Sequence, residues 1–247
     1  MISIIMPSYN SASTIRLAII SVLSQTYKNI ELIIVDGGST DETLNIISNC
    51  IKNEKYHICK YISEKDLGVY DAMNKGVNLA SGDWLFFLGT DDILLPSFSD
   101  ACNMLINKNM MYYCNTFLNQ HCRIYDGKFS KLKLSIRNLS HQTIFYPKIV
   151  FDKYTYDLNY KIVADYILNL NCFGNKEIKK QYIPLTISVY NESGLSNTNI
   201  DTLFYSNKFC IIRKYLGLWY ACNSAIFDYF HFVYKKYNPK IEHLKEC

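Results

Sequence analysis

The sequence predicts an α/β protein with an open, mostly parallel sheet flanked by helices. Short apolar runs alternate with segments of helical periodicity through the first hundred residues. One run, Trp84–Leu88, is apolar at every position, which is typical of a parallel strand buried on both faces. A chain of 247 residues, 49% of them apolar, is also long enough to bury a full core.

The elements are expected in regular succession. Strands are predicted at residues 2–5, 31–35, 57–62 and 84–88, and helices carry apolar residues over 15–22, 44–51 and 70–79. We expect Ser11 or Ser13 to cap the first helix, and Ser39 with Glu42 to form a capping box for the second. A later strand is predicted at 182–190. This alternation predicts βα units joined by crossover helices.

Polar side chains follow each of the first four strands. They are Tyr9 and Asn10, Asp36 and Asp41, Glu64 and Asp66, and Asp91 with Asp92. Right-handed crossovers place these ends at one edge of the sheet, where open α/β sheets bind ligands. Any single loop could owe such residues to turn and cap formation. The consecutive pair Asp91 and Asp92 is not needed for a cap, and its hard oxygens suit a divalent cation.

Five motifs, in this order, resemble the motif series of glycosyltransferase family 2. They are Pro7-Ser8-Tyr9-Asn10, Asp36-Gly37-Gly38-Ser39-Thr40-Asp41, Glu64 with Asp66 and Gly68, Tyr70-Asp71-Ala72-Met73-Asn74-Lys75-Gly76, and Thr90-Asp91-Asp92. The likeness is dense to about residue 100 and thinner to about 196. It implies a GT-A fold and inverting transfer of a hexose or N-acetylhexosamine from a nucleoside diphosphate sugar. UDP is the commonest nucleotide of the family, and Mn²⁺ or Mg²⁺ its cofactor.

The resemblance also implies roles for individual residues. Asp92 is expected to bind the metal, and Asp91 the ribose or donor sugar. The other residues expected on the nucleotide-sugar side are Pro7, Tyr9, Asn10, Asp36, Asp66, Asp71, Asn74 and Lys75. One position departs from the family pattern, because Gly37 stands where many members carry a second aspartate. A contact to the base from that position is therefore absent.

An inverting enzyme needs a general base on the acceptor hydroxyl. Asp165, in the segment Val163-Ala164-Asp165-Tyr166-Ile167-Leu168, resembles the family's catalytic base, although an acid in the first turn of a helix is the alternative. By the same resemblance, His141 and Gln142 are placed on the acceptor or diphosphate side, with a structural histidine as the alternative. The run 193–196 is either a loop over the donor or a simple turn.

Composition restricts the partners and the compartment. The net charge of +4 does not demand nucleic acid, and we expect no such partner. Nine cysteines without a Cys-x-x-Cys pair argue against a disulfide framework and a zinc site, and favour a reducing compartment. The amino terminus lacks the features of a signal peptide, so the cytoplasm is expected.

The chain changes character after residue 200. Aromatic and aliphatic residues recur at helical spacing, with basic residues near the ends of the segment: Lys208, Arg213, Lys214, Lys235 and Lys236. The uncharged stretch 215–227 is too short to span a bilayer, so the alternatives are an interfacial helix or packing against the catalytic domain or a second subunit. We expect a catalytic domain at 1–200, with a nucleotide-sugar half at 1–100 and an acceptor half at 101–200, and a helical tail at 201–247.

The resemblance extends these expectations to the acceptor. Bacterial members of this size commonly extend a lipid-linked oligosaccharide on polyprenyl diphosphate, as in O-antigen or capsule assembly, at the inner face of the plasma membrane. The other functions considered are a sugar-nucleotide binding protein without turnover and a sugar nucleotidyltransferase. The latter usually has a glycine-rich basic loop after its first strand, where this chain has Pro7-Ser8-Tyr9-Asn10. The sequence also lacks the motifs of P-loop and dinucleotide-binding proteins.

Overall fold

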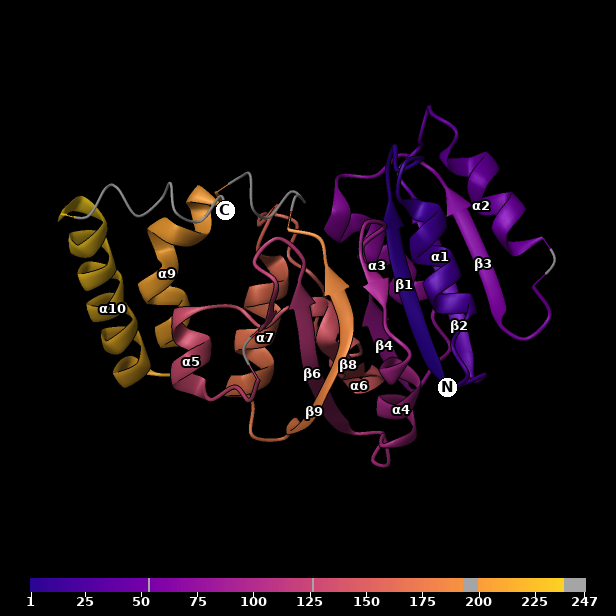
Figure 1. Cartoon of the computed structure of the whole chain (residues 1–247). Helices are drawn as coiled ribbons and strands as arrows, with labels where there is room; N and C mark the ends of the chain where they lie inside the picture. Colours follow the sequence, from indigo (N-terminus) through magenta and orange to yellow (C-terminus); the bar gives the residue numbers. More distant parts are fainter. Residues whose placement is uncertain (53, 126, 193–199, 238–247) are drawn as a thin grey trace.

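The computed structural model describes residues 1–52, 54–125, 127–192 and 200–237. In chain order, its elements are β1 (Ile2–Ser8), α1 (Ile15–Leu23), β2 (Ile30–Asp36), α2 (Thr43–Ile51), β3 (Ile58–Ser63), α3 (Val69–Leu79), β4 (Trp84–Phe87), β5 (Ile93–Leu94), α4 (Ser97–Asn103), β6 (Met110–Leu118), β7 (Arg123–Tyr125), α5 (Lys131–Ile136), η1 (His141–Thr143), β8 (Ile144–Pro147), α6 (Lys148–Phe151), α7 (Ala164–Gly174), β9 (Lys179–Tyr190), α9 (Thr202–Tyr215) and α10 (Leu218–Tyr237). The expected α/β fold and the helical C-terminal segment are confirmed (Figure 1).

The strands form one sheet in the order β3-β2-β1-β4-β8-β6-β9-β5, with β7 paired to β6. The first four strands run parallel, and Ile2 of β1 lies opposite both Ile30 of β2 and Trp84 of β4. β8 is antiparallel to both β4 and β6, whereas β9 is parallel to β6. Right-handed crossovers explain the parallel half. The antiparallel strands beyond β4 were not anticipated from the sequence.

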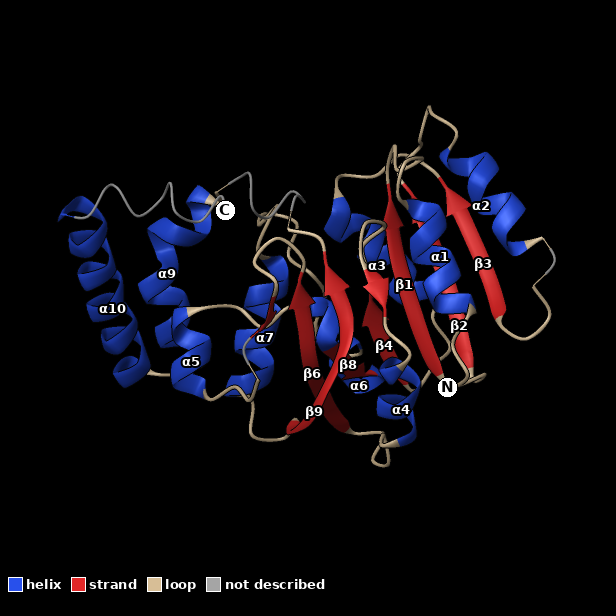
Figure 2. Cartoon of the chain, in the orientation of Figure 1, coloured by secondary structure: helices blue, strands red, loops and turns tan. Residues whose placement is uncertain are grey.

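Helices cover both faces of the sheet (Figure 2). Alternate side chains of β1 enter two different cores. Ile4 and Met6 pack with α1 and α4, and Ile5 packs with α3 and α7. Helix α3 lies very close to β1 at Gly76, where an added Cβ would overlap Cγ2 of Ile5. The parallel strands are therefore apolar along their whole length because both faces are covered.

The predicted helix caps are wrong. Helix α2 follows Glu42, which makes no side-chain cap hydrogen bond, while the Ser39 hydroxyl is bonded to Asp36. Asp41 instead accepts a hydrogen bond from the Thr43 N–H at 3.0 Å. At α1, Ser11 contributes its carbonyl rather than its side chain, and Ser13 makes no capping bond. Ser39, which was predicted to cap α2, instead bonds to Asp36 in the loop after β2. Asp41, which is closer to the start of α2, accepts the hydrogen bond from Thr43.

Helix α9 packs along its length against the rest of the chain, whereas α10 packs through its first turns and leaves its second half exposed. Phe204 and Ile212 of α9 and Ala221 of α10 are fully buried, and the Ser224 hydroxyl donates to the Ser135 carbonyl of α5. From Ala225 to the end of α10, by contrast, nearly every described side chain is exposed. Among the described residues, no helix is both long and apolar enough to cross a bilayer.

Lys208 is one basic residue that the structure places differently from the expectation. Its side chain is buried, and its ammonium group lies 2.8 Å from Asp228. Arg213 and Lys214 remain exposed in the last turn of α9. Lys208 therefore joins α9 to α10 and is not part of a basic surface.

Candidate active site

The carboxyl ends of β3, β2, β1 and β4 lie side by side at one edge of the sheet, as predicted. Their loops are tied to one another. Asn10 adopts the left-handed backbone region, with φ of 46°, and its N–H donates to the Ser39 hydroxyl at 2.8 Å. The Asn10 side-chain oxygen accepts from the Thr40 N–H at 2.9 Å. The ring of Tyr9 is 63% exposed beside this junction, so it is free to stack on a ligand.

Asp36 holds the loop after β2 in shape. Its side chain is fully buried and accepts the N–H groups of Gly38 at 3.0 Å and Ser39 at 2.8 Å. The hydroxyls of Ser63, at 2.7 Å, and of Ser39 also donate to it. Four donors satisfy this carboxylate within the protein, so Asp36 fixes the shape of the loop after β2. Pro7, also expected on the nucleotide-sugar side, is buried in β1 opposite Val35.

The space beside Gly37 is taken by Asp66. A Cβ at residue 37 would lie 2.5 Å from Oδ2 of Asp66, which is itself partly exposed. Asp66 also accepts the Gly68 N–H at 2.9 Å. The glycine therefore leaves room for a carboxylate that comes from the next strand end.

Three further residues of the α3 segment are held by protein partners. Asp71 accepts the Leu67 N–H at 3.0 Å, and the Lys75 ammonium lies 2.9 Å from Glu64 and 3.5 Å from Asp71. The amide of Asn74 uses its oxygen and its nitrogen on the main chain of Tyr156, both at 3.0 Å. Asn74 thus fastens α3 to the segment before α7, while Lys75 stays partly exposed.

Asp91 and Asp92 converge above Gly89. A Cβ at residue 89 would lie 2.9 Å from Oδ1 of Asp91 and 2.9 Å from Oδ2 of Asp92, so only glycine leaves this space open. Asp92 is 2% exposed, and its Oδ1 accepts the Asn191 N–H from the end of β9 at 3.0 Å. Burial, reinforced by the charge of Asp91, raises the pKa of Asp92 to about 7.

This pair fits a divalent cation. Two neighbouring carboxylates in a buried position are unfavourable when both are charged, and a cation between them offsets that repulsion. Burial also raises the pKa of Asp91. No three His, Cys, Asp or Glu side chains lie close enough to form a metal site among the described residues. A cation held here would therefore need oxygen ligands from a bound molecule.

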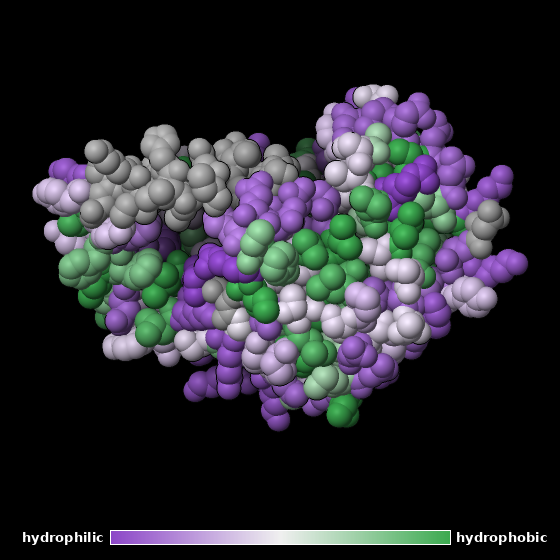
Figure 3. All heavy atoms as spheres, viewed as in Figure 1, coloured by the Kyte–Doolittle hydropathy of each residue, from purple (hydrophilic) through white to green (hydrophobic). Residues whose placement is uncertain are grey.

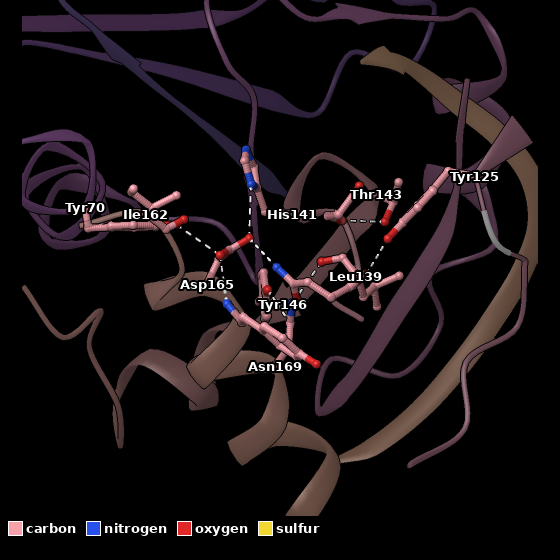
Figure 4. Close-up of polar contacts among 12 residues, drawn as sticks. Tyr70, Tyr125, Leu139, His141, Thr143, Tyr146, Ile162, Asp165 and Asn169 are labelled. Carbon is pink, nitrogen blue, oxygen red and sulfur yellow. Dashed lines mark hydrogen bonds and ion pairs between the residues drawn. The ribbon is translucent and has the colours of Figure 1, made fainter. Parts of the chain in front are cut away.

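Asp165 sits in the first turn of α7 at the centre of a hydrogen-bond network (Figure 4). Its Oδ1 accepts from the Tyr70 hydroxyl at 3.0 Å, and its Oδ2 accepts from the Asn138 amide at 2.9 Å. The network continues because Asn169 donates to Asn138 at 3.0 Å and accepts from the Tyr146 hydroxyl at 2.7 Å. These hydrogen bonds fix the orientation of the carboxylate, and Asp165 is only 6% exposed.

His141 contacts the predicted base. Its Nδ1 is 3.4 Å from Oδ2 of Asp165. Burial alone would lower the pKa of His141, but the hydrogen bond and charge of Asp165, together with the charges of Asp92 and Asp91, outweigh it and raise the pKa. The charges of the predicted base and of the predicted metal pair therefore both act on this imidazole.

Several residues of the site were missed by sequence reasoning. Tyr70 entered the sequence analysis only as part of a motif and Asn138 not at all, yet both donate hydrogen bonds to Asp165. The position of Asn138 three residues before His141 was the available signal. Gln142, which was predicted, is 1% exposed and its amide nitrogen has no hydrogen-bond partner among the described residues. The predicted loop at 193–196 lies outside the described residues.

Comparisons with known proteins show the family of the chain. The family model described as Glycosyl transferase family 2 matches residues 3–118. A PGL/p-HBAD biosynthesis glycosyltransferase of Mycobacterium tuberculosis is 37% identical over 211 residues, which cover 83% of this chain and 82% of the relative. The chain belongs to glycosyltransferase family 2. An uncharacterized glycosyltransferase of Rickettsia prowazekii is 33% identical over 221 residues, covering 82% of this chain and 68% of the relative.

Solved structures show that this family 2 glycosyltransferase has the GT-A fold. S. aureus TarS 1-349 in complex with UDP matches 87% of this chain and 70% of its own, with a TM-score of 0.64 and 16% identity. The mannosyltransferase PcManGT of Pyrobaculum calidifontis, in complex with GDP-Man and Mn²⁺, matches 91% of this chain and 73% of its own, with a TM-score of 0.64 and 12% identity. The chain spans 43% of a longer TarS chain. The family and fold expected from the sequence are thus confirmed.

Proposed function

We propose that this glycosyltransferase is a metal-dependent inverting hexosyltransferase that uses a nucleoside diphosphate sugar, with UDP as the nucleotide. The observation that carries the proposal is that Asp91 and Asp92 converge above Gly89 after β4, while Tyr70 and Asn138 fix Asp165 in the first turn of α7. A transferase needs a cation-binding carboxylate for the leaving diphosphate and a base for the acceptor. We assign these roles to Asp92 and Asp165, since the donor binds at the carboxyl edge of the sheet in this fold class.

Asp92, assisted by Asp91, would hold Mn²⁺ or Mg²⁺ against the donor diphosphate. When bound, such a cation offsets the negative charge that grows on the diphosphate as it departs. Oxygens of both carboxylates lie close together above Gly89, as a shared cation would require. The complexes of TarS with UDP and of PcManGT with GDP-Man and Mn²⁺ support a nucleotide-sugar donor and a divalent metal.

The reaction then follows from the position of Asp165. The acceptor hydroxyl oxygen attacks the anomeric carbon, the bond from that carbon to the phosphate oxygen breaks, and the hydroxyl proton passes to Asp165. The Tyr70 hydroxyl keeps its proton, because burial and the charge of Asp165 raise its pKa well above the usual value. Tyr70 and Asn138 therefore act as donors that orient the base. The longer contact to His141, at 3.4 Å, is the one an acceptor hydroxyl could most readily replace.

We propose that residues 1–100 form the donor half, with Tyr9, Asn10, Asp66 and Lys75 around the nucleotide, and that 101–200 form the acceptor half. On this proposal, His141 and Gln142 face the acceptor or diphosphate. The acceptor would be a polyprenyl-diphosphate-linked glycan in bacterial surface polysaccharide (O-antigen or capsule) assembly. The enzyme would work at the inner face of the plasma membrane, as is common among family members of this size.

The exposed half of α10 supports contact with a membrane surface. Tyr229, Phe230 and Phe232 are 65%, 64% and 66% exposed, and Trp219 is 61% exposed. Figure 3 shows hydrophobic residues over the α10 region at one end of the molecule. Aromatic rings suit the headgroup boundary of a bilayer. Apolar side chains exposed on several sides of one helix are unfavourable in water, so this segment needs an apolar partner.

The test of the transferase begins with the donor. A panel of nucleotide sugars is screened for thermal stabilisation with and without Mn²⁺, since a ligand that binds only the folded protein raises its melting point.

The selected donor is then used to compare wild type with Asp165→Asn. We expect the donor Kd to stay within about twofold, while turnover falls about 100-fold or more because a general base is lost. Asp152→Asn, an exposed aspartate, is the control. Wild-type turnover in Asp165→Asn would refute the assigned base, and donor binding without transfer or hydrolysis would indicate a binding protein.

Membrane contact is best tested by point substitutions. Deleting the helical tail would remove core residues of α9 and of the first turns of α10. Replacing Phe227, Phe230 and Phe232 with serine should reduce sedimentation with phosphatidylglycerol liposomes. Ile106→Ser, at an 87% exposed position far from α10 in the chain, is the matched control. Equal sedimentation of both variants and wild type would rule out binding through α10.

A further inference from the structure

A cavity lies away from the candidate active site. It has a volume of about 480 Å³ and is lined by the first residues of β9, the segment that leads into α5, and the end of α7. This volume falls in the range typical of small-molecule sites, about 300–1,000 Å³. Its mouth is basic and its walls are aromatic. The residues that matter here are Lys128, Lys131 and Lys180, with the rings of Tyr113, Phe173 and Tyr182.

The three lysines have no carboxylate partner. None of them forms an ion pair with any residue that the structure describes, and no acidic side chain among those described residues lines the cavity. The Lys180 ammonium donates to the Asn175 carbonyl at 2.7 Å and lies 5.8 Å from the centre of the Phe173 ring. Burial lowers the pKa of Lys180 to about 8, and the positive charge of Lys131 acts in the same direction. Three unpaired cations around one cavity repel one another, and an anion would remove that penalty.

The walls indicate what the anion is attached to. Tyr113 packs against Phe173 and Tyr182, with ring centres 6.0 and 5.5 Å away. Tyr113 and Phe173 belong to one of the two cores, so these walls are held rigidly. A rigid aromatic surface beside a basic mouth suits a ligand with both an apolar or planar part and a charged group. Lysine side chains act as point charges toward phosphate, and three of them match a multiply charged group better than a single carboxylate.

The cavity is separate from the donor and acceptor side. Phe173 lies in the last turn of α7 and Asp165 in its first turn, eight residues earlier. A rise of 1.5 Å per residue puts them about 12 Å apart along the helix. The lining strand residues Tyr113 and Lys180 also belong to the beginnings of β6 and β9, whereas the carboxylates gather at the opposite, carboxyl edge of the sheet.

We propose that this lysine-lined cavity binds a phosphoryl group carried on an apolar or planar molecule, at a site distinct from the donor site. The proposal does not depend on the transferase mechanism. A soluble phosphorylated compound and an anionic lipid headgroup share this chemistry, and the experiment below separates them.

Lysine protection in the wild-type protein provides the test. The protein is treated with an amine-acetylating reagent at pH 7.5 in EDTA, and modification of each lysine is followed by mass spectrometry. The probes are inorganic pyrophosphate, phenylphosphonate, and vesicles of phosphatidylglycerol or phosphatidylcholine. At ten times its Kd, a bound probe should slow acetylation of Lys180 about tenfold. Lys179, the exposed neighbour that does not line the cavity, is the internal control and should react at an unchanged rate.

Variants assign the protection to this cavity. The double variant Lys131→Gln and Lys180→Gln should lose at least tenfold in probe affinity by calorimetry, and Lys179→Gln should keep it. Asp92→Asn should also keep it, because the donor site is not involved. Protection by phenylphosphonate indicates a soluble ligand, and protection by phosphatidylglycerol vesicles alone indicates a lipid headgroup. If no probe slows acetylation of Lys180 relative to Lys179, the proposed site does not exist.

Discussion

Replacing Asp92 with asparagine should stabilise the metal-free protein while abolishing its response to metal. Asp92 is 2% exposed, and its pKa rises from 3.8 to about 7 in the folded protein, chiefly through burial and then through the charge of Asp91. A carboxyl whose folded pKa is raised contributes stability below its unfolded pKa and loses it as the pH rises through the folded value. The loss therefore develops between about pH 4 and pH 7.

The magnitude follows from the pKa difference of about three units. At about 1.4 kcal/mol per unit, the ionised form costs up to about 4 kcal/mol at pH 8, and partial relaxation of the site reduces this to about 2–4 kcal/mol. Asparagine keeps an oxygen for the Asn191 N–H but cannot ionise. We therefore expect Asp92→Asn to exceed wild type by about 2–4 kcal/mol at pH 8 and by much less at pH 5.

The assay is urea denaturation at pH 5 and pH 8, first in EDTA and then, without EDTA, with UDP alone and with UDP and saturating Mn²⁺. Adding Mn²⁺ to the UDP complex should stabilise wild type at pH 8 and less at pH 5, because protons compete for the carboxylate. It should not stabilise Asp92→Asn. Asp100→Asn, an exposed aspartate on α4, controls for the loss of a negative charge. A variant that is less stable than wild type at pH 8 in EDTA would refute the reasoning.

Two further predictions concern the scaffold of the donor half. Gly76→Ala should destabilise the protein by about 2 kcal/mol, because the Cβ of the alanine would overlap Ile5. If urea denaturation finds this variant as stable as wild type, α3 does not pack so closely on β1. Glu31→Gln should cost about 2 kcal/mol, since the buried carboxylate accepts from Lys60 at 2.6 Å and from the Ser81 N–H at 2.9 Å. These bonds outweigh burial and lower the pKa of Glu31, so the difference from wild type should shrink as the pH falls below about 4. Glu177→Gln, at an exposed ion pair, is the control and should leave stability nearly unchanged.

Local sequence determined the order of the elements and the edge of the sheet that carries the site. The four parallel strands lie within a few residues of their predicted positions, because apolar runs and helical spacing are local signals. The pair Asp91 and Asp92 could be placed at a strand end for the same reason. The antiparallel course of β8 and β6 could not, since strand direction depends on where the chain turns in space.

The tertiary structure alone decided which groups meet. Tyr70 and Asp165 are 95 residues apart in the chain, and Asn138 lies 27 residues before Asp165, yet both donate to its carboxylate. The burial of Lys208 against Asp228 and the gathering of three lysines around the lysine-lined cavity also depend on packing between α9, α10, α5 and β9. Periodicity shows which face of an element is buried. Hydrogen bonds between side chains that are far apart in the sequence form only once the chain has packed, because the two partners lie on different helices, strands or loops.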